Sequence, residues 1–379
     1  MPTPTTAETR PAPGTSKDEI ETPALLVNLD TMEANVREYV SFAEANDVRL
    51  RSHVKTHKNA ELAKRQSEYG GDSGIVCQTL SEVEVMARNG IDDIYLSYMA
   101  VGRRKLERLV WLSEKLDRFA TTVDGPGNVE PLQEAAAERG EDIDVILEVD
   151  VGLHRTGVAP GEPALETARF VREQPNLNFQ GLLAYEAHVK SEAETQAEYE
   201  TYCAEAMDRV QETVDLLESE GISVPEVKVG GTATSRYSGR HPVVTEINPG
   251  MYPFMDVGEL EHRPFEVDRT DCAATVVSSV ISTPSEDRAV VDAGSKTLSM
   301  DTSQLPVPRY RDDIEYVNAS EEHGWLDTAD VDGSLAVGDR IEFIVPHVCT
   351  TVNLHDMIIG VRDGRVEEFW PVQARGKVK

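Results

Sequence analysis

The sequence predicts a mixed α/β protein: an N-terminal (β/α)8 TIM barrel followed by a C-terminal, mainly-β domain. From residue 23 to 262, short apolar runs alternate with segments whose apolar residues recur at helical spacing. About seven or eight such strand–helix units favour a closed barrel over an open doubly wound sheet. No GxGxxG motif opens any unit, which argues against a dinucleotide-binding fold. After residue 263, runs rich in Val, Ile and Thr with turn residues between them predict strands joined by hairpins.

The predicted elements follow one another in a regular order. The first strand is expected in TPALLVNLD and the second in VRLRSHVKT, each before an amphipathic helix. Later barrel strands are expected in SGIVCQT, DDIYLSY, RFATTVD, DVILEVDVG, FQGLLAYEAH, VPEVKVGGTAT and TEINPGMYPFMD. Strands of the β-domain are expected in FEVDRTDCAATVVSSVIST, EDRAVVDAG, RIEFIVPHVCTTVN, MIIGVRDG and RVEEFWPV. We therefore predict a disordered extension at 1–22, the barrel at 23–262 and the β-domain at 263–379.

The composition excludes several classes of protein. The net charge of −31 is spread along the chain of 379 residues, so the surface repels nucleic acids and anionic membranes. An acidic, lysine-poor composition is typical of proteins in concentrated salt, which predicts a halophilic protein. The four cysteines lie far apart without a CxxC motif, which favours the reducing cytoplasm. The N-terminus has no apolar signal-peptide core, and no run of about 18 apolar residues predicts a membrane span.

The basic stretch RSHVKTHKN contains the first candidate for a reactive residue. Strand side chains alternate faces, so Arg51, His53 and Lys55 are expected on one face, with Lys55 at the strand's carboxyl end. Reactive groups of barrel enzymes lie at such ends. A desolvated lysine near other cations is a good nucleophile toward carbonyl compounds. Lys58 is expected to face solvent in the following loop. A solvated basic turn is the alternative interpretation of the whole stretch.

Three further motifs carry candidate site residues. VGGTATS, with Gly231 and Thr232, has the glycines and hydroxyls that let backbone N–H groups approach a phosphate, although most Gly-Gly pairs are only turns. NPGMYPFMD places Tyr252 after a strand, where a structural tyrosine is the default. In PHVCTTVNLHD, His347 and Cys349 lie two apart on an expected strand and so on one face. Imidazole and thiolate suit Zn²⁺, and two protein ligands leave positions for water and substrate.

Together these motifs resemble the D-threonine aldolase and D-serine dehydratase family of metal-activated pyridoxal-phosphate enzymes, which have the alanine racemase-like fold (fold type III). The resemblance covers nearly the whole chain after residue 22. It runs in order through RSHVKTHK, CQTLSEVEVM, GIDDIYLSY, EVDVGLHRTGV, GLLAYEAH, GGTATS, EINPGMYPFMD, STPSEDRAVVDAGSKT, EEHG and PHVCTTVNLHD. So many motifs in one order are specific for the family and much less so for the reaction.

The resemblance implies a role for each candidate residue. It implies that Lys55 binds the cofactor pyridoxal phosphate covalently and that His347 and Cys349 bind a divalent metal. Zinc is favoured by the cysteine, with manganese or magnesium as alternatives. The remaining implied cofactor residues are Arg155 and Tyr185 near the ring, Gln78 lining the pocket, and Gly231, Thr232 and Tyr252 around the phosphate. The family also implies a homodimer and a small D-amino acid as substrate.

Two departures from the aldolase pattern leave the reaction open. Cys349 stands where aldolases of the family have aspartate, which is the dehydratase-like choice. Lys190 and Ser191 stand where those aldolases have a candidate base, and the nearest histidine is His188. Other segments of the sequence (EINPGMYPFMD, NLHD, EFWPVQARG) resemble the aldolases more than the dehydratases. We therefore expect retro-aldol cleavage to glycine and an aldehyde, or to glyoxylate from 3-hydroxyaspartate, with His188 as candidate base.

Three alternatives remain open. One is β-elimination to a keto acid and ammonia, as in D-serine and D-3-hydroxyaspartate dehydratases. Another is a non-catalytic pyridoxal-phosphate carrier, against which the β-domain and the histidine–cysteine pair argue. A racemase is disfavoured because racemases of this fold need no metal.

Overall fold

The computed structural model describes residues 10–70 and 74–379, and the chain divides into two compact units. The barrel unit comprises Arg37–Lys55, Asn59–Tyr252 and Gly376–Lys379. The β unit comprises residues 10–36, Thr56–Lys58 and Pro253–Arg375. The division differs from the predicted boundaries, because the first strand and a three-residue excursion after Lys55 belong to the β unit. No helix in the described ranges is both long and apolar enough to cross a lipid bilayer.

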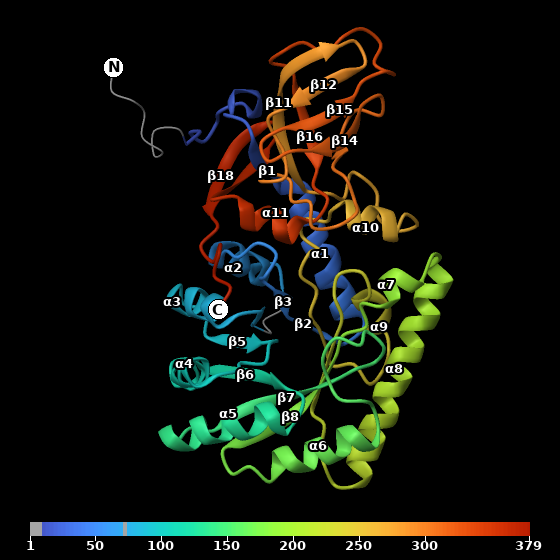
Figure 1. Cartoon of the computed structure of the whole chain (residues 1–379). Coiled ribbons are helices and arrows are strands. Elements are labelled where there is room, and N and C mark those ends of the chain that lie inside the picture. Colours follow the sequence, from blue (N-terminus) through green and yellow to red (C-terminus); the bar gives the residue numbers. More distant parts are fainter. Residues whose placement is uncertain (1–9, 71–73) are drawn as a thin grey trace. The chain divides into compact units, whose positions relative to one another are not determined.

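The barrel unit is built on a parallel sheet that closes on itself (Figure 1). Its strand order is β2-β10-β9-β8-β7-β6-β5-β4-β3. The two end strands, β2 (Arg49–Leu50) and β3 (Ser52–His53), are consecutive pieces of one extended segment, so the barrel has eight strand positions. The other strands are β4 (Ile75–Cys77), β5 (Asp93–Leu96), β6 (Arg118–Val123), β7 (Ile143–Val149), β8 (Leu177–Ala184), β9 (Glu226–Val229) and β10 (Glu246–Ile247). The predicted (β/α)8 barrel is confirmed.

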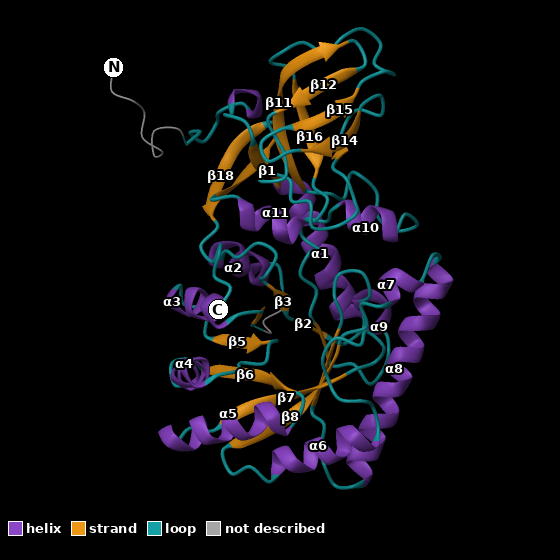
Figure 2. Ribbon diagram, viewed as in Figure 1, coloured by secondary structure: helices purple, strands orange, loops and turns teal. Residues whose placement is uncertain are grey.

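Helices form the outer layer around these strands (Figure 2). They are α2 (Ala60–Glu68), α3 (Leu80–Arg88), α4 (Arg103–Ser113), α5 (Pro126–Arg139), α6 (Glu162–Arg172) and α8 (Gln196–Ser219). Two four-residue helices, α7 (Val189–Glu192) and α9 (Ser235–Ser238), follow β8 and β9. Strand alternation separates two cores. Ile75 and Cys77 pack outward in the strand–helix core. Val76, between them, packs with Tyr95 and Ile146 in a small second cluster. That cluster therefore lies on the inner face of the barrel strands.

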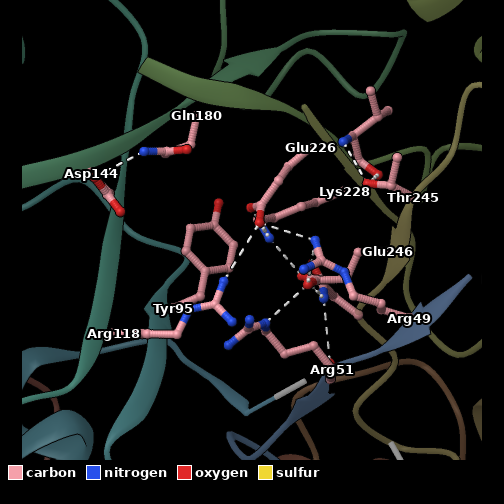
Figure 3. A network of polar contacts seen from close by, with 12 residues as sticks. Arg49, Arg51, Tyr95, Arg118, Asp144, Gln180, Glu226, Lys228, Thr245 and Glu246 are labelled. Atoms are coloured by element: carbon pink, nitrogen blue, oxygen red, sulfur yellow. Dashed lines mark hydrogen bonds and ion pairs between the residues drawn. The ribbon is translucent and has the colours of Figure 1, made fainter. Parts of the chain in front are cut away.

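A network of charged side chains lies around the first residues of several barrel strands (Figure 3). Asp93, Glu226 and Glu246 are the first residues of their strands, so they share the N-terminal end of the barrel. Lys228 Nζ lies 2.8 Å from Glu246 and 2.7 Å from Glu226. Arg51 Nε lies 3.1 Å from Glu246, and Arg51 Nη1 lies 2.6 Å from Asp93. Arg51 therefore points into the barrel, as strand alternation predicted, and is part of a structural network.

This network predicts a specific loss of acid stability. Burial alone would raise the pKa of Glu246, but Lys228 and Arg51 outweigh it and lower the pKa to about 2. The carboxylate therefore contributes stability that is present above the unfolded-state pKa and is lost as pH falls toward 2. Glu246→Gln leaves buried cations underpaired and should lower the free energy of unfolding at pH 7 by about 3–5 kcal/mol.

Urea unfolding monitored between pH 7 and pH 2 checks this expectation. The difference between wild type and Glu246→Gln should shrink as the pH falls from about 4.5 toward 2. Glu138→Gln, at an exposed position in α5, serves as the control and should stay within about 0.5 kcal/mol of wild type. A pH-independent difference would show that the Glu246 charge does not stabilise the barrel.

The β unit contains a mixed sheet in the order β14-β15-β12-β11-β1-β17-β18, with β16 paired to β11 and β13. Its strands are β1 (Ala24–Asn28), β11 (Ala274–Ser285), β12 (Arg288–Val291), β13 (Val307–Pro308), β14 (Glu315–Ala319), β15 (Gly324–Asp327), β16 (Arg340–Ile344), β17 (Met357–Arg362) and β18 (Arg365–Pro371). Its helices are η1 (Lys17–Glu19), α10 (Val257–His262) and α11 (Val348–Leu354), and α1 (Leu29–Ala45) begins in this unit and continues into the barrel unit.

The N-terminal segment differs from the prediction in two ways. Strand β1 pairs with β11 and β17, so the prediction that it is the first barrel strand is wrong. Four of its five residues are buried, and such a run fits the interior of either sheet. The extension predicted to be disordered includes ordered backbone: Gly14 N–H donates to Val366 O, and Ser16 bridges Arg365. Residues 1–9 lie outside the described residues.

Candidate active site

The predicted cofactor residues lie at the C-terminal end of the barrel strands. His53 ends β3, Gln78 directly follows β4, Tyr185 directly follows β8 and Gly230 directly follows β9. Parallel strands in a closed barrel end on the same face, so these four positions share one mouth. His53 Nε2 lies 3.0 Å from Gln78 Oε1, which ties the first strand position to the second.

Lys55, Arg155 and Tyr185 come together at this mouth. The Lys55 Nζ lies 6.0 Å from the centroid of the Tyr185 ring. The guanidinium carbon of Arg155 lies 4.8 Å from the same centroid. Arg155 also lies 3.5 Å from Glu148, near the end of β7. The three residues come from widely separated positions in the sequence, so the fold brings together the cluster that the motifs predicted.

Lys58 differs from its prediction. Only 9% of it is exposed, its backbone is left-handed (φ +53°), and its carbonyl accepts the Ala374 N–H. The prediction that Lys58 faces solvent is therefore wrong. The chain turns sharply at this residue before α2, whose N-cap is Asn59.

The glycine-rich loop after β9 is shaped to accept an anion. Gly230 has a left-handed backbone (φ +86°), and a Cβ there would lie 2.8 Å from the Cβ of Ser235. A Cβ on Gly231 would lie 3.2 Å from the Tyr185 ring. The Thr232 hydroxyl accepts the Met251 N–H at 2.9 Å. The Ser235 hydroxyl is buried and has no hydrogen-bond partner among the described residues. This unpaired hydroxyl and the close backbone fit the phosphate of pyridoxal phosphate.

Tyr252 lies behind this loop and is fully buried. Its hydroxyl accepts a hydrogen bond from Gln66 Nε2 at 2.9 Å and lies 2.7 Å from the Ser52 hydroxyl. Burial raises the pKa of Tyr252 to about 12, so the phenol stays protonated. Its ring centroid lies 4.5 Å from that of Tyr39, whose hydroxyl donates to the Thr232 carbonyl at 2.8 Å. Through Tyr39, Tyr252 supports the glycine-rich loop.

His188 immediately precedes α7 and packs against the loop after β7. A Cβ on Gly152 would lie 2.7 Å from His188 Nε2, so only glycine fits beside the ring. His188 Nδ1 is buried and has no hydrogen-bond partner within the described part of the chain. Burial lowers the pKa of His188, which keeps the imidazole neutral. The ring is therefore in the protonation state that a general base requires.

The histidine–cysteine pair lies in the β unit, at the start of a helix. His347 is the N-cap residue of α11 and Cys349 lies in its first turn, so the prediction that both lie on a strand is wrong. Pro346, which lacks a backbone N–H, lies two residues after the end of β16. The Asp256 carboxylate then accepts the Val348 N–H at 3.0 Å, which stabilises the helix start.

Neighbouring polar groups orient this pair. His347 Nδ1 lies 2.8 Å from Asp301 Oδ2, so Nε2 is the nitrogen left for a metal. The Cys349 Sγ lies 3.2 Å from the Thr56 hydroxyl. Burial opposes the charged ring, but the hydrogen bonds to Cys349 and Asp301 prevail and raise the pKa of His347 to about 9. An acidic group beside the ring nitrogen is a typical environment for a metal-binding histidine.

The donor set fits a metal held by two protein ligands. Among the described residues, no group of three His, Cys, Asp or Glu side chains is placed to hold a metal. A pair of nitrogen and sulfur donors suits an open, catalytic site rather than a closed structural one. Asp301 was missed in the sequence because it lies 46 residues from His347 in no recognisable pattern. His355, next to the C-terminal end of α11, lies with its Nε2 2.9 Å from the Thr297 carbonyl.

Comparison with known proteins identifies the family. The family model described as alanine racemase, N-terminal domain, matches residues 27–257. A second model, described as a putative serine dehydratase domain, matches residues 273–361. The two matches cover most of the barrel unit and most of the β unit.

Individual relatives agree with these matches. A 3-hydroxy-D-aspartate aldolase of Paracoccus denitrificans is 36% identical, covering 96% of this chain and 95% of its own. The crystal structure of D-threonine aldolase from Filomicrobium marinum has a TM-score of 0.92 and 36% identity, covering 97% of this chain and 99% of its own.

A dehydratase is also similar. D-threo-3-hydroxyaspartate dehydratase from Delftia has a TM-score of 0.85 and 26% identity, covering 94% of this chain and 98% of its own. Two further structures are variants of a D-threo-3-hydroxyaspartate dehydratase. One has a histidine replaced by alanine, and the other has a cysteine two positions later replaced by alanine and is in a metal-free form. The identity and coverage of these matches place the chain in the family of D-threonine aldolases and D-serine dehydratases, pyridoxal-phosphate lyases with the alanine racemase-like fold.

Proposed function

We propose that the protein is an aldolase that breaks the Cα–Cβ bond of a D-β-hydroxy-α-amino acid. The products are glycine and an aldehyde, or glycine and glyoxylate when the substrate is 3-hydroxyaspartate. One observation carries the proposal: the Lys55–Arg155–Tyr185 cluster occurs in the same chain as an oriented histidine–cysteine pair. The relatives at 36% identity are named as aldolases of this substrate class.

The barrel unit would hold pyridoxal phosphate. Lys55 would bind it covalently, Arg155 and Tyr185 would contact its ring, and Gln78 would line the pocket. Backbone of Gly231 and Thr232 and the unpaired Ser235 hydroxyl would bind its phosphate. When bound, this cofactor supplies an electron sink for the bond that breaks.

The β unit would hold a divalent metal through His347 Nε2 and Cys349 Sγ. Sulfur and imidazole ligands favour zinc, with manganese or magnesium as alternatives. A metal here supplies a Lewis acid for the substrate's hydroxyl group. The dehydratase variants at a histidine and a cysteine two positions apart support this assignment. Thr56, which contacts Cys349, directly follows Lys55 in the sequence.

His188 is the proposed base for the substrate hydroxyl. Burial lowers the pKa of His188, which favours the neutral imidazole that a general base requires. Replacing His188 with asparagine should lower kcat while the visible absorbance of the bound cofactor stays unchanged. An unchanged kcat would remove His188 from the mechanism.

Dehydration is the second candidate, favoured by Cys349 and by the similar dehydratase. In that reaction Lys55 would take the Cα proton, hydroxide would leave Cβ, and the products would be a keto acid and ammonia. The reaction differs from aldol cleavage in the first bond that breaks, Cα–H instead of Cα–Cβ.

A product assay separates the two reactions. The protein, loaded with cofactor and metal, is incubated with D-threonine, D-serine and 3-hydroxyaspartate. We expect glycine with acetaldehyde or glyoxylate to exceed ammonia and keto acid, and we expect L-threonine to be left intact. Ammonia and keto acid as main products would establish the dehydratase instead. If neither set of products forms, both candidates are contradicted, and a non-catalytic cofactor carrier is favoured.

We also propose a cytoplasmic homodimer adapted to concentrated salt. The net charge of −31 supports the salt adaptation and the family resemblance supports the dimer. Light scattering and activity in molar KCl check these two points, and a monomer or higher activity at low salt would contradict them.

A further inference from the structure

Glu186 is a fully buried carboxyl group that has no role in the proposed reaction. It directly follows Tyr185, and none of its surface is exposed. Its Oε2 accepts the Gly230 N–H at 3.2 Å and its Oε1 accepts the Ser238 hydroxyl at 2.7 Å. The Thr234 hydroxyl forms a further hydrogen bond with it. Its partners therefore stand at the first residue, in the middle and at the end of the 230–238 segment.

The partners of Glu186 are not local in sequence. Gly230 lies 44 residues and Ser238 lies 52 residues beyond Glu186. Removing the carboxyl would leave buried donors unsatisfied, at a cost of about 1–3 kcal/mol for each. Gly230 has a left-handed backbone, which glycine adopts without steric cost, and the Glu186 carboxyl accepts its N–H.

The dipeptide Tyr185–Glu186 joins two parts of the cofactor site. The Tyr185 ring contacts Arg155 and approaches Lys55. The same ring also lies close to Gly231, since a Cβ added to Gly231 would be 3.2 Å from it. One residue further on, the Glu186 carboxyl holds the amide of Gly230. Tyr185 thus lies at the part of the site proposed for the cofactor ring, and Glu186 supports the loop proposed for its phosphate.

We infer that Glu186 is a positioning residue that sets the shape of the phosphate-binding loop and so gives the site its affinity for the phosphorylated form of the cofactor. The inference rests on the proposed binding of pyridoxal phosphate by the barrel unit. Glu186 contacts the loop at Gly230, Thr234 and Ser238, and it would act through these residues.

The charge of Glu186 is consistent with this role. A buried carboxylate beneath an anion-binding loop would repel the phosphate. Burial raises the pKa of Glu186, which favours the neutral form and reduces this repulsion. A glutamine at this position resembles the neutral form and keeps an acceptor for the loop donors. Alanine has no side-chain acceptor and leaves the loop donors without a partner.

The test compares two ligands that differ only in the phosphate. Apoprotein is titrated with pyridoxal phosphate and with pyridoxal, and absorbance reports binding. Glu186→Ala should weaken pyridoxal phosphate binding by about tenfold or more, the equivalent of one lost loop hydrogen bond. Pyridoxal binding should change by less than about twofold. Glu186→Gln should restore pyridoxal phosphate binding to within about threefold of wild type.

Two further variants keep the test decisive. Ser238→Ala removes one donor to Glu186 and should give a smaller loss of phosphate preference, even if Glu186→Ala does not fold. Asp292→Ala is the matched control, because Asp292 also accepts one backbone N–H and two hydroxyls, but within the β unit. It should lower thermal stability and leave the ratio of the two affinities unchanged.

Each outcome has one meaning. If wild-type protein binds no pyridoxal phosphate, the proposed function fails. If wild type binds it and Glu186→Ala lowers both affinities equally, Glu186 is only structural and the inference is wrong. An unchanged pyridoxal phosphate affinity in Glu186→Ala would also overturn it. The inference is supported if Glu186→Ala loses the preference for pyridoxal phosphate over pyridoxal and Glu186→Gln restores it.

Discussion

Replacing Lys55 with alanine is expected to abolish the visible absorbance of the bound cofactor and to lower activity by several orders of magnitude. Lys55 is the lysine of the cluster with Tyr185 and Arg155 at the carboxyl ends of the barrel strands. The proposed covalent bond to the cofactor needs the Lys55 amine, which alanine lacks. Borohydride treatment of wild type followed by mass spectrometry should find the cofactor on the peptide that contains Lys55.

The control is Lys64→Ala, at an exposed position on α2. It should keep both the absorbance and the activity, because Lys64 lies outside the cluster. Lys58 is unsuitable as a control, since it is buried and adopts a left-handed backbone. Full absorbance in Lys55→Ala, or the cofactor trapped on another lysine, would contradict the assignment.

Replacing His347 or Cys349 with alanine is expected to remove the bound metal while the cofactor remains. The proposed cofactor residues all belong to the barrel unit, whereas both metal ligands belong to the β unit. Metal content by mass spectrometry should fall to background, and visible absorbance should persist. Because Lewis-acid stabilisation contributes several kcal/mol, kcat should fall on the order of a thousandfold.

Asp301→Asn tests the orientation of this pair separately. Asp301 fixes Nδ1 of His347, and loss of such a partner weakens metal binding about 10–100-fold. Added metal should therefore restore activity in Asp301→Asn but not in the alanine variants. His323→Ala, at an exposed position of the β unit, should behave as wild type. Wild-type metal content in Cys349→Ala would exclude the cysteine as a ligand.

The local sequence determined much of this protein. Apolar periodicity predicted the barrel, and strand alternation placed Arg51 and His53 inside it, where both now have partners. These predictions succeeded because facing direction and strand ends are encoded within a few residues. The family resemblance, rather than the local sequence, implied that Lys55, Arg155 and Tyr185 lie near one cofactor, and the three side chains lie together.

The tertiary structure alone decided which segments pair. Strand β1 belongs to the β unit, although its apolar residues fit a barrel strand equally well. Asp301 on His347 and Glu186 on Gly230 are hydrogen bonds across 46 and 44 residues, with no local signal. Periodicity specifies which face of an element is buried, but not against which distant partner. That choice depends on the packing of the whole chain, and it is what placed the supporting carboxyls behind the predicted site residues.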